Sequence, residues 1–112
     1  YHAIFAFASF QGARCYVGHS HIPKIFEAVE NKRIREVSNN EVIFSEGHRH
    51  LINVGSVGQP RDGDSRSAYG IVDLERNDYQ LIRVDYDYRK TQERMKMNSL
   101  PEYLINRLAL GN

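Results

Sequence analysis

The fold of this chain is decided by one stretch, Arg14-Cys15-Tyr16-Val17-Gly18-His19-Ser20-His21-Ile22-Pro23. Residues 14–17 form a short apolar run that ends at Gly18, which predicts a buried strand leading into a loop. Pro23 closes that loop and makes it stiff. On an extended segment residues i and i+2 point the same way, so the imidazoles of His19 and His21 can face one metal ion or two adjacent ones. The alternative for an isolated His-x-His pair is a polar strand end.

Hydrophobic periodicity on both sides of this stretch predicts further regular structure. Residues 1–10 can form a helix that Gly12 would stop. After the loop, short apolar runs bounded by turn residues predict strands. These strands are 24–29 and 33–37, joined at 30–32, then 42–44, 51–54, 68–74 and 79–85, the last two joined at 75–78.

The end of the chain predicts two helices. Asp87 can cap a helix over 88–97. The sequence Ser99-Leu100-Pro101-Glu102 has the form of a capping box, so a last helix should start there. Its apolar stripe would be Leu100, Leu104 and Leu108, with Gly111 as the C′ residue. One helix, five to seven strands and two helices favour an α+β fold, with an antiparallel or mixed sheet and helices on one side.

Composition predicts one globular domain without a strongly charged partner. The 112 residues carry a net charge of +1, which gives no strong attraction to nucleic acid or to an anionic membrane. No apolar run approaches the ~20 residues of a membrane span, and no signal-peptide pattern opens the chain. The single cysteine, Cys15, cannot form an internal disulfide, so we expect a small buried side chain in a cytoplasmic protein. The chain begins at Tyr1 rather than at methionine, so we expect its natural start to lie upstream.

A second loop, residues 55–64, carries groups suited to an anion. Gly55-Ser56-Val57-Gly58 leaves backbone N–H groups free to approach a phosphate closely. Arg61 can offer that phosphate a bidentate fork, and Asp62 would orient Arg61. The alternative is a glycine-rich turn with a surface arginine.

Two imidazoles do not complete a metal site, because catalytic zinc needs three protein ligands and two-metal sites need more. The other candidate ligands are Asp62, Asp64, His48 and His50. His48 and His50 form a second His-x-His pair at the start of a strand, where we expect exposed hairpin residues rather than ligands.

These segments, in this order, resemble one family. Residues 15–23 resemble the strand and G-H-[ST]-H-x-P motif of the calcineurin-like metallophosphoesterases, in particular their small bacterial and archaeal branch. Residues 51–64 resemble the L-I-N-P-G-S-V-G-Q-P-R-D-G-D segment of that branch, and residues 99–111 resemble its C-terminal helix. Ser20 replaces the commoner threonine and Val54 replaces a proline, and neither change removes a ligand atom.

The resemblance implies that residues 1–112 are the C-terminal half of a catalytic domain with a four-layer α/β/β/α fold, contributing mostly one mixed or antiparallel sheet with flanking helices. It implies that His19 binds the second and His21 the first of two divalent metal ions, which would be Mn, Fe, Ni or Zn. Ser56 and Arg61 would lie at the substrate phosphate. The implied reaction is hydrolysis of a phosphomonoester or phosphodiester, of a small molecule or a nucleotide, by a hydroxide that the two metals activate.

In the family, D-x-H, G-D and G-N-H motifs supply the other ligands and the catalytic histidine. This chain contains no Asp-x-His, no Gly-Asp-x-x-Asp and no Gly-Asn-His. The only Gly-Asp is Gly63-Asp64, inside the second loop. We therefore assign no catalytic residue, expect the isolated chain to be inactive, and expect it to need an N-terminal half or to self-associate. The alternative function is a non-catalytic interaction or oligomerisation module derived from a phosphoesterase.

Overall fold

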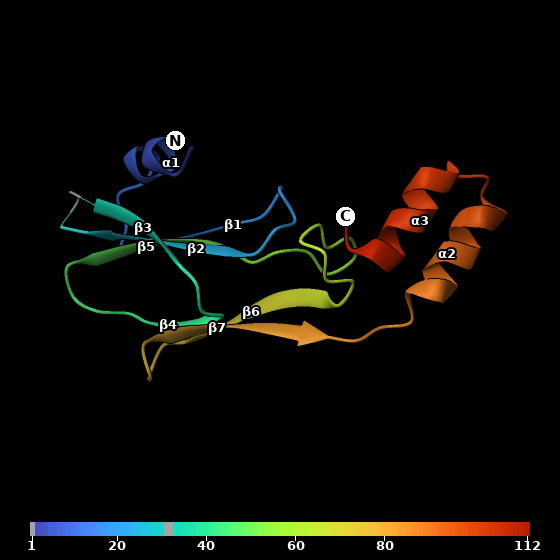
Figure 1. Cartoon of the computed structure of the whole chain (residues 1–112). Coiled ribbons are helices and arrows are strands. Elements are labelled where there is room, and N and C mark those ends of the chain that lie inside the picture. Colours follow the sequence, from blue (N-terminus) through green and yellow to red (C-terminus); the bar gives the residue numbers. More distant parts are fainter. Residues whose placement is uncertain (1, 31–32) are drawn as a thin grey trace.

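The computed structural model describes residues 2–30 and 33–112 (Figure 1). In that part of the chain three helices and seven strands follow one another in the order expected from the sequence. The expected turn at 30–32 falls partly on residues 31 and 32, which lie outside the described residues. The elements are α1 (His2–Ser9), β1 (Arg14–Val17), β2 (Lys24–Val29), β3 (Arg33–Val37), β4 (Glu41–Ile43), β5 (His48–Asn53), β6 (Ser67–Asp73), β7 (Asp78–Val84), α2 (Tyr88–Met97) and α3 (Glu102–Leu110).

The strands form two sheets. The first has the order β1-β5-β2-β3, in which β1 pairs parallel to β5 and the other neighbours are antiparallel. The second is antiparallel, with the order β4-β7-β6. The predicted α+β class is confirmed, with strands divided four and three between the sheets, a more even division than the one dominant sheet expected.

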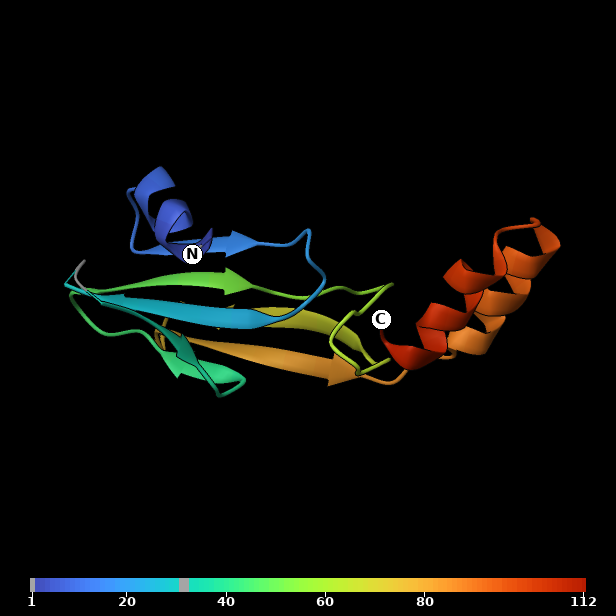
Figure 2. The same cartoon turned by 45° about the horizontal axis from the view of Figure 1, so that its top comes forward.

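The elements are arranged in layers (Figures 1 and 2). Helix α1 lies on the outer face of the four-stranded sheet, and the three-stranded sheet lies along its other face. Helices α2 and α3 form a hairpin that projects from one end of the sheets. No helix among the described residues is long and apolar enough to cross a membrane.

The period of two along the strands divides the core between these layers. On β5, Leu51 points outward and packs with Phe7 of α1, whereas Ile52 points inward and is fully buried. Ile52 packs there with Ile25, Phe44 and Tyr79, so the main apolar cluster lies between the two sheets.

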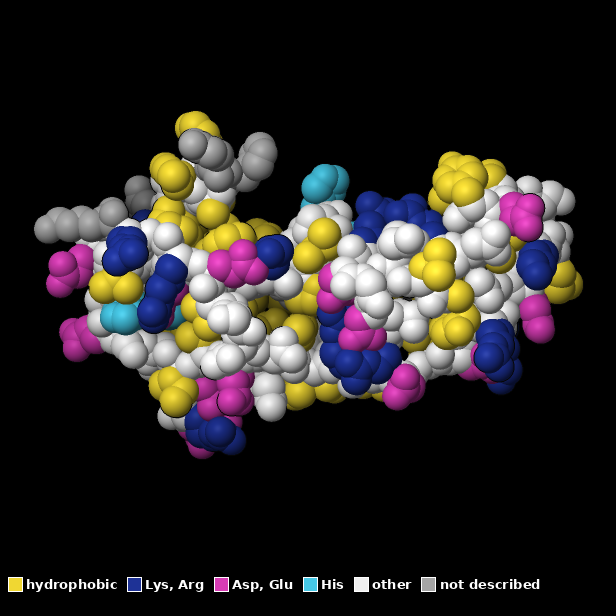
Figure 3. All heavy atoms as spheres, in the orientation of Figure 1, with side chains coloured by type: hydrophobic (Ala, Val, Ile, Leu, Met, Phe, Trp, Pro, Cys, Tyr) yellow, Lys and Arg dark blue, Asp and Glu magenta, His cyan; other side chains and the backbone are white. Residues whose placement is uncertain are grey.

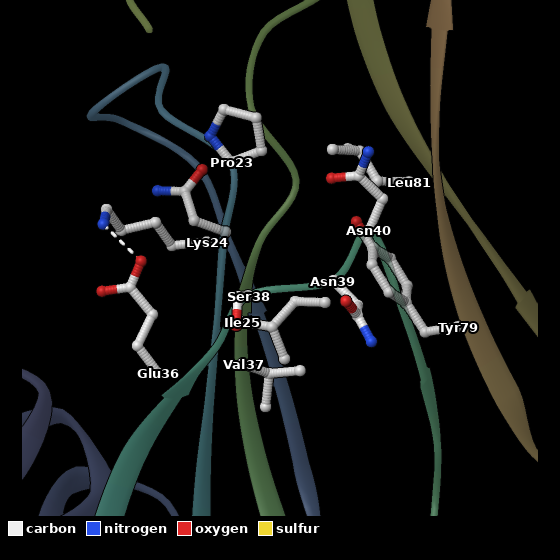
Figure 4. Close-up of a pocket in the computed structure, with 11 residues that line it drawn as sticks. Pro23, Lys24, Ile25, Glu36, Val37, Ser38, Asn39, Asn40, Tyr79 and Leu81 are labelled. Atoms are coloured by element: carbon white, nitrogen blue, oxygen red, sulfur yellow. Dashed lines mark hydrogen bonds and ion pairs between the residues drawn. The ribbon is translucent and has the colours of Figure 1, made fainter.

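The loop that Pro23 closes lies beside the two sheets. A cavity of about 110 Å³ lies there, with Tyr79 and Leu81 of β7 facing Ile25 of β2 (Figure 4). Asn53 at the end of β5 also lines it. The cavity therefore lies at the border of the main apolar cluster, to which Ile25 and Tyr79 belong.

Strand β1 differs from the buried strand that its apolar sequence predicted. It is an edge strand, and its Tyr16 and Val17 are 42% and 38% exposed. Cys15 packs beside the cluster under α1 and is half-buried, so the expectation of a buried thiol was only partly right. An apolar run predicted the strand correctly but could not show which neighbours would cover it.

The last helix begins later than the capping-box pattern predicted. It starts at Glu102, and Ser99 lies before it with a positive φ of 55°. No side chain caps its N-terminus, because Pro101 holds the N-cap position. Its buried face consists of Ile105 and Leu108, and Leu100 is 43% exposed, so the predicted stripe was wrong at its first residue.

Two other helix ends can be compared with the sequence. Asp87 holds the predicted N-cap position of α2 without a side-chain capping hydrogen bond. Gly111 ends α3 in the left-handed conformation, with a φ of 66°, as predicted. The sequence therefore located these ends correctly, although the side-chain cap at Asp87 is not formed.

Gly70 on β6 has no side chain, and the ring of Tyr79 occupies the space that a Cβ would take. A Cβ on Gly70 would lie 2.3 Å from Cε2 and 2.9 Å from Cζ of that ring, which is 1% exposed. We expect Gly70→Ala to lower the free energy of unfolding by about 1–3 kcal/mol, the usual cost of overpacking. Chemical denaturation measures this, with Gly12→Ala as the control because a Cβ on Gly12 makes only ordinary contacts. Equal unfolding midpoints for the two variants would contradict the prediction.

Candidate metal and phosphate site

The loop between β1 and β2 presents His19 and His21 from a turn, not from an extended segment. Both residues have positive φ, 73° and 61°, and the Ser20 amide donates to the Gly18 carbonyl at 3.0 Å. The expectation that the two imidazoles point the same way because the backbone is extended was therefore wrong. Left-handed backbone at residues other than glycine is costly and is found preferentially at functional sites. The loop is thus held in a conformation that its own residue types do not favour.

The ring of His21 is oriented by the second loop. Its Nδ1 lies 2.8 Å from the carbonyl oxygen of Gln59. A carbonyl oxygen only accepts, so in the neutral ring Nδ1 carries the proton and Nε2 carries the free lone pair. Histidines that bind metal ions are commonly fixed in this way by a hydrogen bond from the other ring nitrogen. His19 is exposed, and the same loop carries it.

Asn53, at the end of β5, joins the two loops. Its Nδ2 donates to the Gly18 carbonyl and to Ser20 Oγ, both at 2.8 Å. Its Oδ1 accepts the Gly55 amide at 3.0 Å, which makes an Asx turn. This role of Asn53 was not predicted, although an asparagine at a strand end, two residues before a glycine, is the signal of such a turn.

Arg61 is held beside His21. Its amide donates to the His21 carbonyl at 3.1 Å. Its Nε and Nη2 donate to Gln59 Oε1 at 3.2 and 2.5 Å, so the guanidinium is steered by Gln59. The prediction that Asp62 orients Arg61 was wrong, because the Asp62 carboxylate pairs with Arg83 of β7. Asp62 and Arg83 lie far apart in the sequence. The prediction chose Arg61 as the partner of Asp62 because the two are adjacent in the chain.

The glycine-rich part of the second loop still offers donors. Ser56 Oγ accepts the Gln59 amide at 3.0 Å, and its own hydroxyl donates to no acceptor in the part of the chain that the structure describes. Val57 and Gly58 are exposed, and their amides have no hydrogen-bond acceptor among the described residues. A hydroxyl, backbone amides and a guanidinium in one loop are the donors that bind a phosphate.

The loop ends in a network of charged groups. Hydrogen bonds from Arg66, at 2.7 and 3.0 Å, hold the pKa of Asp64 at about 2 against the opposing effect of burial. Arg83 lies 3.8 Å from the same carboxylate. Asp64 therefore stays charged at neutral pH and is engaged with arginines.

The donor chemistry of His19 and His21 suits a divalent metal ion, since neutral imidazole binds zinc, manganese, iron and nickel. Within residues 2–30 and 33–112, however, no three His, Cys, Asp or Glu side chains come together in a way that could hold a metal. The two histidines fit one part of a site, and its remaining ligands would have to come from outside the described residues.

His48 and His50 lie elsewhere, and the prediction that they are exposed hairpin residues was wrong. Strand β5 begins at His48 rather than at Leu51, so His48 and His50 point inward with Ile52. His50 is fully buried, and the His48 side chain is 28% exposed.

Glu27 of β2 is the partner of both rings. Its Oε2 lies 2.9 Å from His48 Nδ1 and 3.1 Å from His50 Nε2, and its Oε1 accepts from Arg35 Nε at 2.7 Å. Burial opposes the charge of Glu27, but hydrogen bonds from His48, Arg35 and His50 outweigh it and hold the pKa of Glu27 at about 2. Burial lowers the pKa of His50 and outweighs the effect of Glu27 upon it. This cluster is thus a buried carboxylate that is held by three side chains and has Arg35 as its permanently charged partner.

Comparisons with known proteins find chains that are similar to this one. The chain is 41% identical over 100 residues to an uncharacterized protein of Methanocaldococcus jannaschii, and the match covers 89% of this chain and 40% of that protein. A solved metallophosphoesterase from Sphaerobacter thermophilus superposes with a TM-score of 0.83 and 35% identity, covering 98% of this chain and 46% of that one. No protein-family model matches the chain. The chain spans less than half the length of these relatives, and the resemblance predicted from its sequence is confirmed.

Proposed function

We propose, on the premise that this chain shares the fold of the metallophosphoesterases over nearly its whole length, that it supplies part of the metal and phosphate site of a phosphoesterase. The reaction is hydrolysis of a phosphomonoester or phosphodiester. One observation carries the proposal: His21 and Arg61 are bound to each other's loops, through His21 Nδ1 to Gln59 and through the Arg61 amide to the His21 carbonyl. A metal ligand and a phosphate-binding fork are thereby fixed side by side.

Each residue has a distinct role in this proposal. His21 offers Nε2 to one divalent metal ion, and His19 offers its imidazole to a second. When bound, two such ions (Mn, Fe, Ni or Zn) supply an activated water and neutralise charge on the phosphate. The Arg61 guanidinium donates hydrogen bonds to the phosphate oxygens, and the Ser56 hydroxyl donates another. Gln59 orients both His21 and Arg61.

The remaining ligands and the proton donor for the leaving group belong, in this proposal, to a preceding half of the domain. The chain exposes apolar surface that such a half would cover. Ile4 and Phe5 of α1 are 57% and 73% exposed, and β1 with Tyr16 and Val17 is an edge strand of its sheet. Hydrophobic side chains gather on α1 in Figure 3. Exposed apolar groups of this kind mark interaction surfaces.

Metal analysis and hydrolysis assays test the proposal. The product of the complete reading frame that contains these residues is purified and assayed with p-nitrophenyl phosphate and bis(p-nitrophenyl) phosphate. We expect bound divalent metal and a hydrolysis rate that a chelator abolishes, whereas the isolated 112-residue chain should be inactive. A metal-free product without hydrolysis would contradict it. A metal-free, self-associating protein would instead favour the alternative function, a non-catalytic interaction module. The exposed apolar side chains of α1 and β1 are the observation that supports this alternative.

A further inference from the structure

The C-terminal end of α3 lies against the loop that carries Arg61. The amide of Gly63 donates to the carbonyl of Gly111 at 2.8 Å, and Gly111 is buried. A Cβ on Gly111 would lie 2.7 Å from both the backbone nitrogen and the carbonyl carbon of Asp64. Because these are backbone atoms, they cannot move aside as the end of a flexible side chain can. A side chain at position 111 must therefore displace either the loop or the end of the helix.

The same loop is attached on two further sides. The Arg61 amide donates to the His21 carbonyl at 3.1 Å. Arg83 of β7 pairs with the Asp62 carboxylate, and this arginine side chain is only 10% exposed. Successive residues of the loop are thus bound to the histidine loop, to the three-stranded sheet and to the C-terminus. Loss of one attachment would leave the loop free to shift on that side.

We propose that Gly111 is a positioning residue for phosphate binding. It leaves room for the Asp64 backbone and accepts the Gly63 amide, and so the end of α3 fixes the loop that presents Arg61. The inference rests on the proposed function for the nature of the ligand, a phosphate group. It gives the last helix a role in a site whose side chains all come from earlier in the chain.

Two substitutions separate this role from that of a helix terminator. Asparagine adopts positive φ more readily than alanine does. If Gly111 served only to end the helix, Gly111→Asn would be tolerated much better than Gly111→Ala. Both variants carry a Cβ that displaces the loop, so the Arg61 guanidinium is no longer placed to donate its hydrogen bond to the phosphate. We therefore expect both variants to bind inorganic phosphate at least about tenfold more weakly. Hydrogen exchange at the Arg61 and Gly63 amides should become faster in both.

The control is Gly47→Ala, because Gly47 also has a positive φ of 76° but a Cβ there meets nothing within 4 Å. It should bind phosphate as the wild type does. Deletion of residues 111 and 112 provides a second route if Gly111→Ala does not fold, since it removes the acceptor for Gly63 without adding a Cβ. We expect faster exchange at Gly63 and weaker phosphate binding there too.

Phosphate affinity is measured by calorimetry on the product of the complete reading frame, independently of turnover. Wild-type affinity in Gly111→Asn, or unchanged exchange at Arg61 and Gly63 in every variant, would overturn the positioning role. A wild-type protein that does not bind inorganic phosphate would overturn it as well. Phosphate binding without ester hydrolysis, weakened by both substitutions, would reject the proposed function and support the positioning role.

Discussion

Replacing His21 with alanine is expected to lower phosphate-ester turnover by more than about 100-fold and to reduce bound metal. Loss of a residue that only orients a metal ligand commonly costs 10–100-fold, so loss of the ligand itself should cost more. Of the two histidines, His21 is the better one to substitute, because the Gln59 carbonyl, 2.8 Å from its Nδ1, fixes the orientation of its ring. His19→Ala should lower turnover in the same direction. Steady-state kinetics and metal analysis on the product of the complete reading frame measure both effects.

His48→Ala is the matched control. His48 is also only partly exposed, and its Nδ1 is also held by an oxygen, that of Glu27 at 2.9 Å. It lies on β5 in the cluster between the sheets, away from both loops. We expect turnover per folded molecule and metal content to stay near those of the wild type, although stability falls. Unchanged turnover in both His21→Ala and His19→Ala would refute the assignment of these residues as ligands.

The sequence predicted the order of elements and the two loops because both depend on local patterns. Apolar runs bounded by turn residues located all seven strands, and Gly111 was correctly placed at the end of the last helix. The glycine and proline residues around His19 and His21 likewise marked a loop that the structure contains.

The missed features depend on contacts between distant residues. The burial of His50 follows from its register opposite Glu27 on β2, which no window of sequence contains. The pairing of Asp62 with Arg83 joins a loop to β7 in the same way. The loop with left-handed backbone at His19 and His21 accepts hydrogen bonds from Asn53 and Arg61, which are distant in the sequence. Sequence patterns therefore located helices, strands and loops more reliably than they identified the partners of individual side chains.

Glu27→Gln is expected to lower the free energy of unfolding by about 2–3 kcal/mol, because it removes a buried charged acceptor of hydrogen bonds from Arg35, His48 and His50. Glu36→Gln is the control on the neighbouring strand. Glu36 pairs with Lys24 at 2.6 Å, but both side chains are exposed, so its loss should cost no more than about 1 kcal/mol. Urea denaturation at pH 7 compares the two variants, and equal losses would contradict the assigned role of Glu27.

The pH dependence of stability provides a second test of the same cluster. The folded pKa of Glu27, about 2, lies below its ordinary value of 4.5, so the unfolded chain binds a proton first as the pH falls. The stability that Glu27 contributes is therefore complete above pH 4.5 and is lost as the pH falls toward 2. His50 acts in the same direction at higher pH: burial lowers its pKa below the ordinary 6.5, so the unfolded chain takes up that proton more readily and stability begins to fall below pH 6.5. Glu27→Gln should reduce the decline in the lower range, because one of the carboxylates that are protonated there has been removed. A decline of the same size in the variant between pH 4.5 and 2 would place its origin in other carboxylates, such as Asp64, whose pKa is also about 2.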